Sequence, residues 1–316
     1  MERRNADPGL VDGMTTELGG PRTADLLARL GQVVPWETLA KPVRKLYKNK
    51  DGGAPAWPAV MMIKCVMLAK WYGLSDPQLE EHLRDRLSFR RFIGLSLIDK
   101  TPDETTFVVF RRRLRDAGLE RTLFDAAGKH LEKLGVLVKE GTLVDATIIE
   151  QSCGKKRDDG TSTRDEEASF TKKHGRTYHG YKGHIAADKS GIVTDYRFST
   201  ASHHDSRYID EMTRAEKIAV YGDSAYSDTT RRRILKSRGV IDAIVYKRNR
   251  GQKDLFDWQE RWNKLVSKVR AFVEHPFARM KRTGYRDVRY RGLRRNEVDF
   301  AFNLMAHNFK HALCLV

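Results

Sequence analysis

The sequence is poor in cysteine, and its first twenty residues contain no long apolar run. Three cysteines occur in 316 residues, Cys65, Cys153 and Cys314, and no two of them form a CxxC pair. Neither a disulfide framework nor a structural zinc site is therefore indicated, and we interpret Cys65 and Cys314 as small core residues. The opening segment lacks a hydrophobic stretch of the length that a signal peptide or a membrane span requires. We expect a soluble intracellular protein with no membrane partner.

Acidic residues are outnumbered by basic ones. The chain has 42 Asp and Glu against 59 Lys and Arg, which gives a formal charge of +17. An excess of this size indicates a polyanionic partner, and nucleic acid is the first candidate. Basic residues concentrate between positions 279 and 295, where eight of them accompany one acid, Asp287. We expect this segment, including Arg279 and Arg282, to contact phosphates.

The first third of the chain lacks the alternation of a β-strand. Between residues 22 and 135 apolar residues recur every three or four positions, which predicts consecutive helices. The clearest cover residues 57–73, 75–94 and 102–118. Pro58 lies near the start of the first of these and Gly73 at its end, as helix boundaries favour.

The hydrophobic period changes near residue 141. β-like segments follow at 142–151, 178–188, 192–202, 218–226 and 242–248. Helical stretches separate the later ones, including one expected from Asp205 to Lys217, and a helical run begins near residue 256. This order predicts an α/β domain with a mixed five-stranded sheet; a ribonuclease H-like domain would produce it, as would several other mixed-sheet folds.

These patterns divide the chain into three parts. We expect a disordered tail over residues 1–20, an all-α region over 21–137, and the α/β domain, with basic C-terminal helices, over 138–316. Inside that domain, residues 153–178 are polar and nearly free of aliphatic side chains. They predict a mobile loop between the first two strands that becomes ordered on DNA.

Three acids stand out from the other carboxylates by their surroundings. Asp145 is flanked by aliphatic residues in a predicted central strand, Asp223 ends another strand after Gly222, and Glu274 lies in a later helical stretch. Three carboxylates brought together repel each other unless cations neutralise them. Hard divalent ions such as Mg²⁺ do this, and two such ions about 4 Å apart support in-line displacement at phosphorus.

Basic residues accompany Glu274 at helical spacing. Arg270 precedes it by four positions and Lys281 follows it by seven, so an unbroken helix would place all three on one face toward phosphate. Pro276 lies between them and is expected to kink or restart the helix, because it lacks a backbone donor.

Taken together, these residues resemble the DDE transposases of bacterial insertion sequences, in particular the group typified by insertion sequence five. The resemblance runs from about residue 57 to the C-terminus. It rests on LVDATIIEQS, YHGYKGHIAADKSGIV, STASHHD, VYGDSAYSD and VRAFVEHPFARMKR, with SDPQLEEHLRDRLSFRRFIGL and PDETTFVVFRRRL upstream.

The resemblance implies a site and a reaction. The catalytic, metal-binding acids of the family correspond to Asp145, Asp223 and Glu274, and its signature around the glutamate maps onto Arg270 and Lys281. Ser267 takes the place of the usual tyrosine. The implied enzyme has a ribonuclease H-like catalytic domain that binds two Mg²⁺ ions, with Mn²⁺ as a substitute. It exposes a 3′-hydroxyl at each element end and transfers it to target DNA.

The same reading implies partners and a location. The partner is double-stranded DNA, as element ends and as target, and synapsis of two ends suggests a homodimer or higher oligomer. The location would be the bacterial cytoplasm, associated with the nucleoid.

Several alternatives stay open. A nuclease of the same fold would cut DNA without joining it, and a regulatory descendant would only bind it. The N-terminal helices could form a helix-turn-helix or a structural bundle at a dimer interface. His203, His204 and Asp205 could bind a metal, although Asp205 is also placed to cap the next helix, and we favour a supporting role beside the site.

Overall fold

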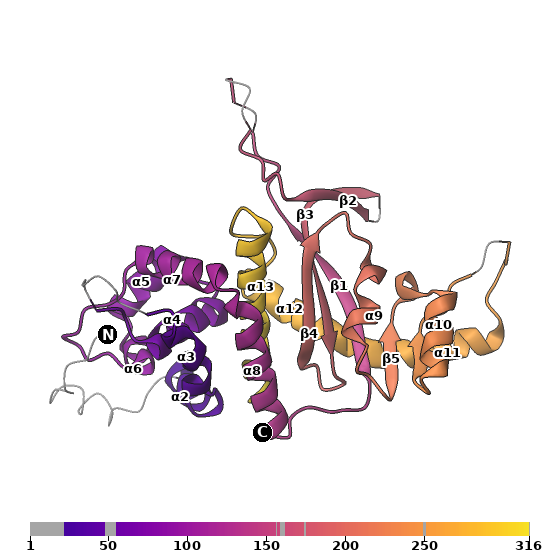
Figure 1. The fold of residues 1–316 in the computed structure, drawn as a ribbon, viewed down its shortest axis with the longest axis horizontal. Helices are drawn as coiled ribbons and strands as arrows, with labels where there is room; N and C mark the ends of the chain where they lie inside the picture. The colour runs from indigo at the N-terminus through magenta and orange to yellow at the C-terminus, as the bar shows by residue number, and fades with distance from the viewer. Residues whose placement is uncertain are drawn as a thin grey trace. The chain divides into compact units, whose positions relative to one another are not determined.

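The computed structural model describes residues 22–47, 55–155, 157–158, 162–173, 175–248 and 251–315. The expected tail over residues 1–20 lies outside them. The chain divides into two compact units. We call the one with residues up to Lys133 and Ala301–Val316 the helical unit, and Leu134–Phe300 the sheet unit; Figure 1 shows their elements.

The helical unit is built from α-helices, as the period of its apolar residues predicted. They are α2 (Arg22–Val33), α3 (Trp36–Arg44), α4 (Ala59–Tyr72), α5 (Asp76–Asp85), α6 (Leu87–Ile93), α7 (Glu104–Asp116), α8 (Leu119–Lys133) and the later turns of α13 (Leu293–Ala312).

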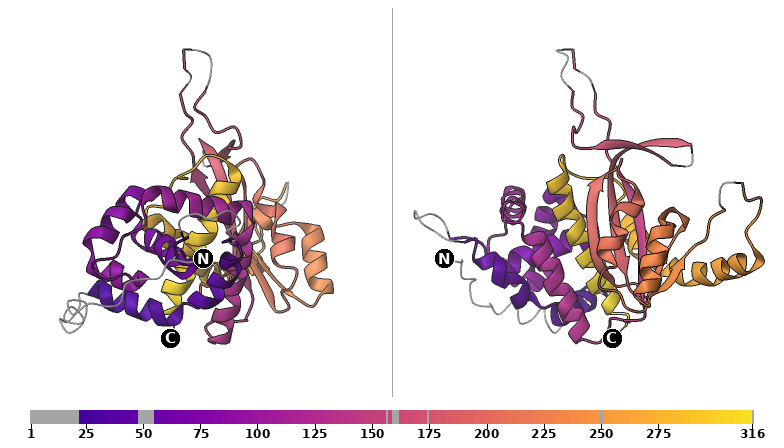
Figure 2. Two further views of the ribbon diagram at one scale, coloured as in Figure 1. Left: turned by 60° about the vertical axis from the view of Figure 1, so that its left-hand side comes forward. Right: turned by 45° about the vertical axis from the view of Figure 1, so that its right-hand side comes forward.

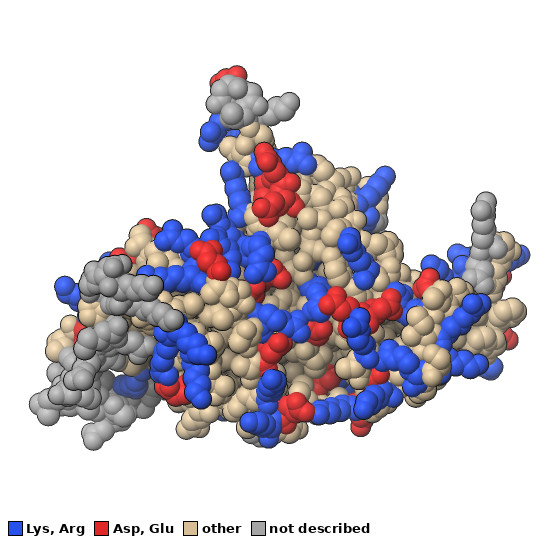
Figure 3. Space-filling model, viewed as in Figure 1, with Lys and Arg blue, Asp and Glu red and all other residues tan. Residues whose placement is uncertain are grey.

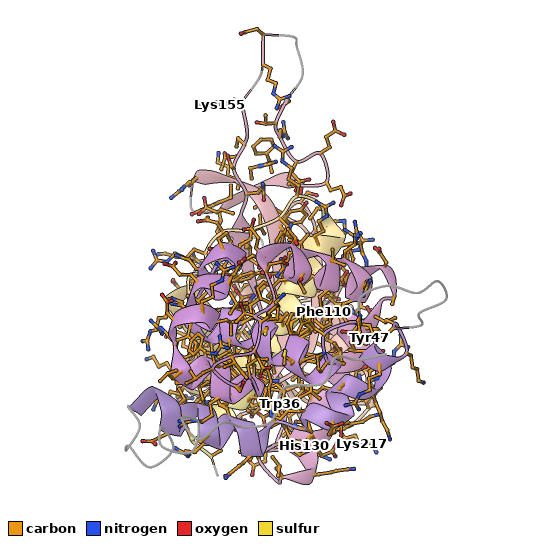
Figure 4. The ribbon with its side chains drawn as sticks, turned by 90° about the vertical axis from the view of Figure 1, so that its left-hand side faces the viewer. Trp36, Tyr47, Phe110, His130, Lys155 and Lys217 are labelled. Carbon is orange, nitrogen blue, oxygen red and sulfur yellow. The ribbon has the colours of Figure 1, made fainter. Side chains whose placement is uncertain are left out.

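Helix α4 forms the centre of this unit. It is apolar on all sides, and most of its side chains are buried. It follows Pro58 and ends at Gly73, whose φ of 69° suits glycine, as predicted. The Trp71 indole donates to the carbonyl of Ala306 at 3.0 Å, and its ring meets that of Trp36 edge to face. Figure 4 labels Trp36 among the side chains of this unit. Cys65 is buried, as expected, whereas Cys314 is exposed because it follows the end of α13.

The single helix expected over residues 75–94 is wrong. The chain forms α5 and α6, separated at Arg86, whose ψ of 110° is extended. Ser75 caps the first helix and Gly94 ends the second, as expected. The buried Arg90 side chain donates to the carbonyls of Leu83 and Asp99. A break that leaves carbonyls without helical partners is thus compensated by a side chain from the following helix.

The sheet unit contains a six-stranded mixed sheet, so the expected count of five is wrong by one. Its strands are β1 (Thr142–Glu150), β2 (Ser169–Lys173), β3 (Arg176–Ala187), β4 (Val193–Thr200), β5 (Ala219–Gly222) and β6 (Ile241–Ile244). The order is β2-β3-β1-β5-β6, and β4 also pairs with β3. Pairs among β1 to β4 are antiparallel, whereas β1–β5 and β5–β6 are parallel.

The extra strand lies in the segment that was expected to be a loop. β2 pairs with the start of β3, and Gly175 turns the chain between them at a φ of 79°. Upstream, Asp165 accepts hydrogen bonds from the Tyr181 hydroxyl at 2.7 Å and from the backbone of Gly292 at 2.9 Å. Figure 2 shows β2 and the start of β3 extending beyond the other strands of the sheet. The sequence did not predict β2 because its residues are mostly polar. An edge strand with exposed side chains does not require the alternation of polar and apolar residues by which strands are recognised.

Short helical elements complete the sheet unit. They are η1 (Asp205–Arg207), α9 (Ile209–Met212), η2 (Ser224–Tyr226), α10 (Thr229–Ser237), α11 (Asp257–Arg270), η3 (Ala271–Val273) and α12 (Glu274–Arg282), followed by the first turns of α13. The helix expected from Asp205 to Lys217 is therefore only η1 and α9. One core cluster joins β1, β3 and β5 to α9 and α10 through Val144, Ala186, Val220, Ile209 and Leu235.

Gly183 on β3 permits close packing by α13. A β-carbon built there would overlap the ring of Phe300, which is fully buried. We therefore expect Gly183→Ala to lower the free energy of unfolding by about 2 kcal/mol through overpacking. Urea denaturation measures the change. Gly128→Ala is the control, because its β-carbon meets nothing within 4 Å in α8, and it should stabilise the protein by about 0.5–1 kcal/mol. Equal effects of the two variants would contradict this account.

Candidate active site

Asp145 lies on β1, and Asp223 follows directly after the end of the adjacent parallel strand β5. The register pairs Thr142 with Val220 and Leu143 with Tyr221. Each aspartate follows the second of these pairs by two residues, so the two side chains point to the same face of the sheet. The sequence could place each acid on a strand, but only the register makes them neighbours.

The Asp145 carboxyl is in an unfavourable environment for a charge. It is half-buried within β1, between β3 and β5. Burial raises its pKa to about 6, and the negative charge of Asp223 acts in the same direction. A hydrogen bond from the backbone of Ala146 and the positive charges of Arg270 and Lys173 oppose this rise. Negative charge is therefore incompletely compensated at this point of the sheet.

Arg270 connects the other two acids. It is the last residue of α11, and its guanidinium lies 3.7 Å from Asp223 Oδ2 and 3.7 Å from Glu274 Oε1. The second oxygen of Asp223 accepts a hydrogen bond from the backbone of Ala225 at 2.7 Å, which caps η2. The structure thus brings Asp145, Asp223, Arg270 and Glu274 into one neighbourhood. Glu274 is the most accessible of the three acids, with 63% of its side chain exposed.

The helix that carries Glu274 is interrupted, as Pro276 predicted. A 3-10 turn, η3, follows Arg270, and α12 restarts at Glu274 with Pro276 in its first turn. Lys281 and Arg282 are exposed on α12, whereas Arg279 is half-buried. Ser267 is exposed on α11. Because the helix is broken, Lys281 does not share one continuous helical face with Arg270.

The donor chemistry of the site fits a hard divalent cation. Carboxylate oxygens are the ligands that such a cation prefers, and the burial that raises the pKa of Asp145 to about 6 leaves the charge of this carboxyl poorly compensated. Among the residues that the structure describes, however, no three His, Cys, Asp or Glu side chains converge closely enough to hold an ion. Arg270 lies between two of the acids, so ion binding requires the carboxylates of Asp223 and Glu274 to turn from the guanidinium.

The His-His-Asp segment beside the site has a different arrangement from the one expected. His204, not Asp205, caps η1 by accepting from the backbone of Ser206. Asp205 instead lies 2.9 Å from the ammonium of Lys182 on β3. His203 is hydrogen-bonded to the Tyr208 hydroxyl at 2.7 Å.

Sequence reasoning also missed three residues near the acids. Lys182, the partner of Asp205, and Tyr226 were not singled out, and neither was Lys173, whose charge reaches Asp145 from the end of β2. The available signals were that Tyr226 lies within VYGDSAYSD, three residues after Asp223, and that Lys182 lies within YHGYKGHIAADKSGIV.

The surface carries the positive charge excess. On the face drawn in Figure 3, Lys and Arg side chains are widely spread, with acids among them. Arg279, Lys281 and Arg282 form no ion pair with any residue in the described ranges. None of the helices in the described part of the chain has the length and apolar composition needed to cross a bilayer.

Two family profiles match the chain. The family profile described as Transposase DDE domain matches residues 137–309, and that described as Transposase domain (DUF772) matches residues 20–113. The first match covers more than half of the chain and includes all three acids. No solved structure matches the chain. Enzymes with the DDE domain act on DNA and generally use divalent metal ions. The chain therefore belongs to the Transposase DDE domain family: it is an insertion-sequence DNA transposase, a polynucleotidyl transferase.

Proposed function

We propose that this transposase cleaves DNA at the ends of its insertion sequence and transfers each exposed 3′-hydroxyl to target DNA, with Asp145, Asp223 and Glu274 as its catalytic acids. The observation that carries the proposal is the parallel register of β1 and β5, which sets the two aspartates beside each other. The contacts of Arg270 with Asp223 and Glu274 add the third acid. We infer membership in the group typified by insertion sequence five from the spacing of Arg270, Glu274 and Lys281.

The sheet supports a ribonuclease H-like catalytic domain. Without β2, the order is β4-β3-β1-β5-β6, with three antiparallel strands followed by two parallel ones. The proposed acids lie where the antiparallel and parallel parts meet, at β1 and β5. We take residues 138–316 as this domain, although residues 301–316 belong to the compact helical unit. Residues 21–137 are then the region that binds DNA ends or a second subunit, in a protein of the bacterial cytoplasm and nucleoid.

The metal is proposed to be Mg²⁺, with Mn²⁺ as a substitute and two ions per site. Asp145 and Asp223 would be shared ligands, and Glu274 would bind the second ion. Bound ions would supply activation of the attacking hydroxyl and stabilisation of the leaving oxygen. Arg270, released from the acids, would hold a phosphate by charge-assisted hydrogen bonds. Arg279, Lys281 and Arg282 would contact the DNA backbone around the site, and the enzyme would act as a dimer or higher oligomer on two ends.

A strand-transfer assay tests this function. The protein is incubated with Mg²⁺, target DNA and an element end that already carries a free 3′-hydroxyl, and joined product is resolved on a gel. We expect joining by the wild type. Cleavage of uncut ends without joining would identify a nuclease. Specific binding to the ends with neither reaction would identify a regulatory protein, and both results would contradict the proposal.

A further inference from the structure

The Arg231 side chain is buried although it carries a charge. It lies in the first turn of α10, where its backbone N–H donates to the capping carboxylate of Asp228 at 2.9 Å. Its side chain is 8% exposed. A buried guanidinium destabilises the folded state unless its donors are paired. The partners that satisfy these donors therefore indicate what the residue does.

Two of the partners come from segments that precede β5. The Asp210 carboxylate on α9 accepts from Arg231 Nε at 2.6 Å and from Nη2 at 2.9 Å. The carbonyl of Ser206, in η1, accepts from Nη2 at 3.1 Å. The planar fork of a guanidinium matches a carboxylate in this two-bonded arrangement. Arg231 is thus held in one orientation by η1 and α9.

The third partner lies directly after Asp223. Arg231 Nη1 donates to the carbonyl of Tyr226, the last residue of η2. A single 3-10 turn has few hydrogen bonds of its own, and their geometry is poorer than in an α-helix. In η2 the N–H of Tyr226 donates to the carbonyl of Asp223 at 3.1 Å. The charge-assisted bond from Arg231 therefore fixes the far end of a turn that is otherwise weakly held.

The geometry of η2 decides the direction of the Asp223 carboxylate. Its Oδ1 accepts a hydrogen bond from the N–H of Ala225, in the middle of the turn, at 2.7 Å. Its Oδ2 lies 3.7 Å from the Arg270 guanidinium. If η2 opened, the N–H of Ala225 would move away from Oδ1 and the carboxylate could rotate. A chain of contacts thus runs from Asp210 through Arg231 and η2 to Asp223.

We propose that Arg231 is a positioning residue that holds η2 closed and so fixes the Asp223 carboxylate for the joining reaction. The inference rests on the proposed function of Asp223. The contacts that carry it are made by residues of this chain alone. The hold on η2 is therefore expected in the protein without metal or DNA, where it can be measured separately from activity.

Hydrogen–deuterium exchange tests the hold on η2 in the full chain, with EDTA and without DNA. Mass spectrometry of peptides covering residues 223–228 reports the N–H groups of the turn. We expect these groups to exchange about tenfold faster in Arg231→Gln than in wild type, because the turn opens more easily without its charge-assisted bond. Asp210→Asn should give a smaller acceleration. It weakens the anchor of the guanidinium, and the fold is expected to tolerate it because the Asp210 side chain is 61% exposed.

The effect on the reaction is measured with pre-cut ends at saturating Mg²⁺, well below the melting temperature. Arg231→Gln should join about 10²-fold more slowly, the usual cost of a misplaced catalytic group. The concentration of element end that gives half-maximal joining should stay at the wild-type value, because a buried side chain does not contact DNA.

Arg238→Gln is the matched control. Arg238 follows the same helix, and its guanidinium donates to the carbonyls of three residues that precede β5, Thr213, Arg214 and Glu216. The variant removes a comparable set of backbone contacts at the opposite end of that strand from Asp223. It should lower the melting temperature, but keep wild-type exchange over residues 223–228 and wild-type joining.

Two results would overturn the role of Arg231. One is wild-type exchange over residues 223–228 in Arg231→Gln or, if that variant does not fold, in Asp210→Asn. The other is an equal loss of joining in Arg238→Gln, which would indicate general destabilisation. Absence of joining by the wild type would instead overturn the proposed function, and the exchange measurement would still decide whether Arg231 holds η2.

Discussion

Asp145→Asn is expected to reduce joining of a pre-cut end to target DNA by about 10³-fold or more, while binding of that end stays close to wild type. The bound metal stabilises the transition state by several kcal/mol, and this stabilisation is lost with its ligand. A 10³-fold decrease in rate corresponds to about 4 kcal/mol. Asparagine keeps the size of the side chain but removes its charge. The strand-transfer assay measures the rate, and a gel-shift assay measures the binding. Joining within tenfold of wild type would exclude Asp145 as a catalytic acid.

The same variant should be more stable than wild type in the absence of ions at neutral pH. The folded-state pKa of Asp145 is about 6, above the ordinary 3.8. Folding therefore favours its protonated form, and the wild-type chain loses stability as pH rises from about 4 to about 6. The asparagine side chain of the variant carries no such penalty, so we expect a gain of about 1–2 kcal/mol at pH 7.5, allowing for partial exposure.

Urea denaturation in EDTA at two pH values tests whether Asp145→Asn raises the free energy of unfolding. The difference between Asp145→Asn and wild type should be present at pH 7.5 and largely lost at pH 4, where both side chains are neutral when folded. A variant less stable than wild type at pH 7.5 would show that the carboxylate is favourably compensated without ions. Opposite effects on stability and activity are the common pattern where a strained site serves catalysis.

Arg270→Gln should change ion binding and joining in opposite directions. Arg270 lies 3.7 Å from both Asp223 and Glu274, so it competes with a divalent ion for them. Its loss should tighten binding of Mn²⁺ to the DNA-free protein by a few fold. Loss of the proposed phosphate clamp should slow joining by about 10²-fold at saturating Mg²⁺, the usual effect of removing one transition-state donor. Calorimetry and single-turnover joining measure the two effects.

Lys268→Gln provides the control for Arg270. It removes one positive charge from the last turn of the same helix, on an exposed side chain. A loss of general electrostatic attraction to DNA would affect both variants alike and would diminish at high salt. If the Arg270→Gln variant joined DNA at the wild-type rate under saturating Mg²⁺, Arg270 would not be a phosphate clamp.

Much of the local structure was predictable from the chain because local physics decides it. Helix α4 is recognisable from its apolar composition, Pro58 and Gly73. The strand that carries Asp145 and the strand that ends just before Asp223 are recognisable from the aliphatic residues beside each acid. β2 and the break at Arg86 were not predictable in this way. An edge strand with exposed side chains has no regular burial pattern, and the carbonyl contacts of the Arg90 side chain that accompany the break join residues that no local pattern relates.

For the site, the sequence by itself determined the chemistry of the candidate residues: their types and spacing identified three acids and an accompanying arginine. Only the tertiary structure decided how they meet. The register of β1 on β5 aligns Asp145 with Asp223, and the interruption after α11 leaves Arg270 near two acids. These relations join residues far apart in the chain. They depend on side-chain direction and strand pairing, which no local pattern of residues contains.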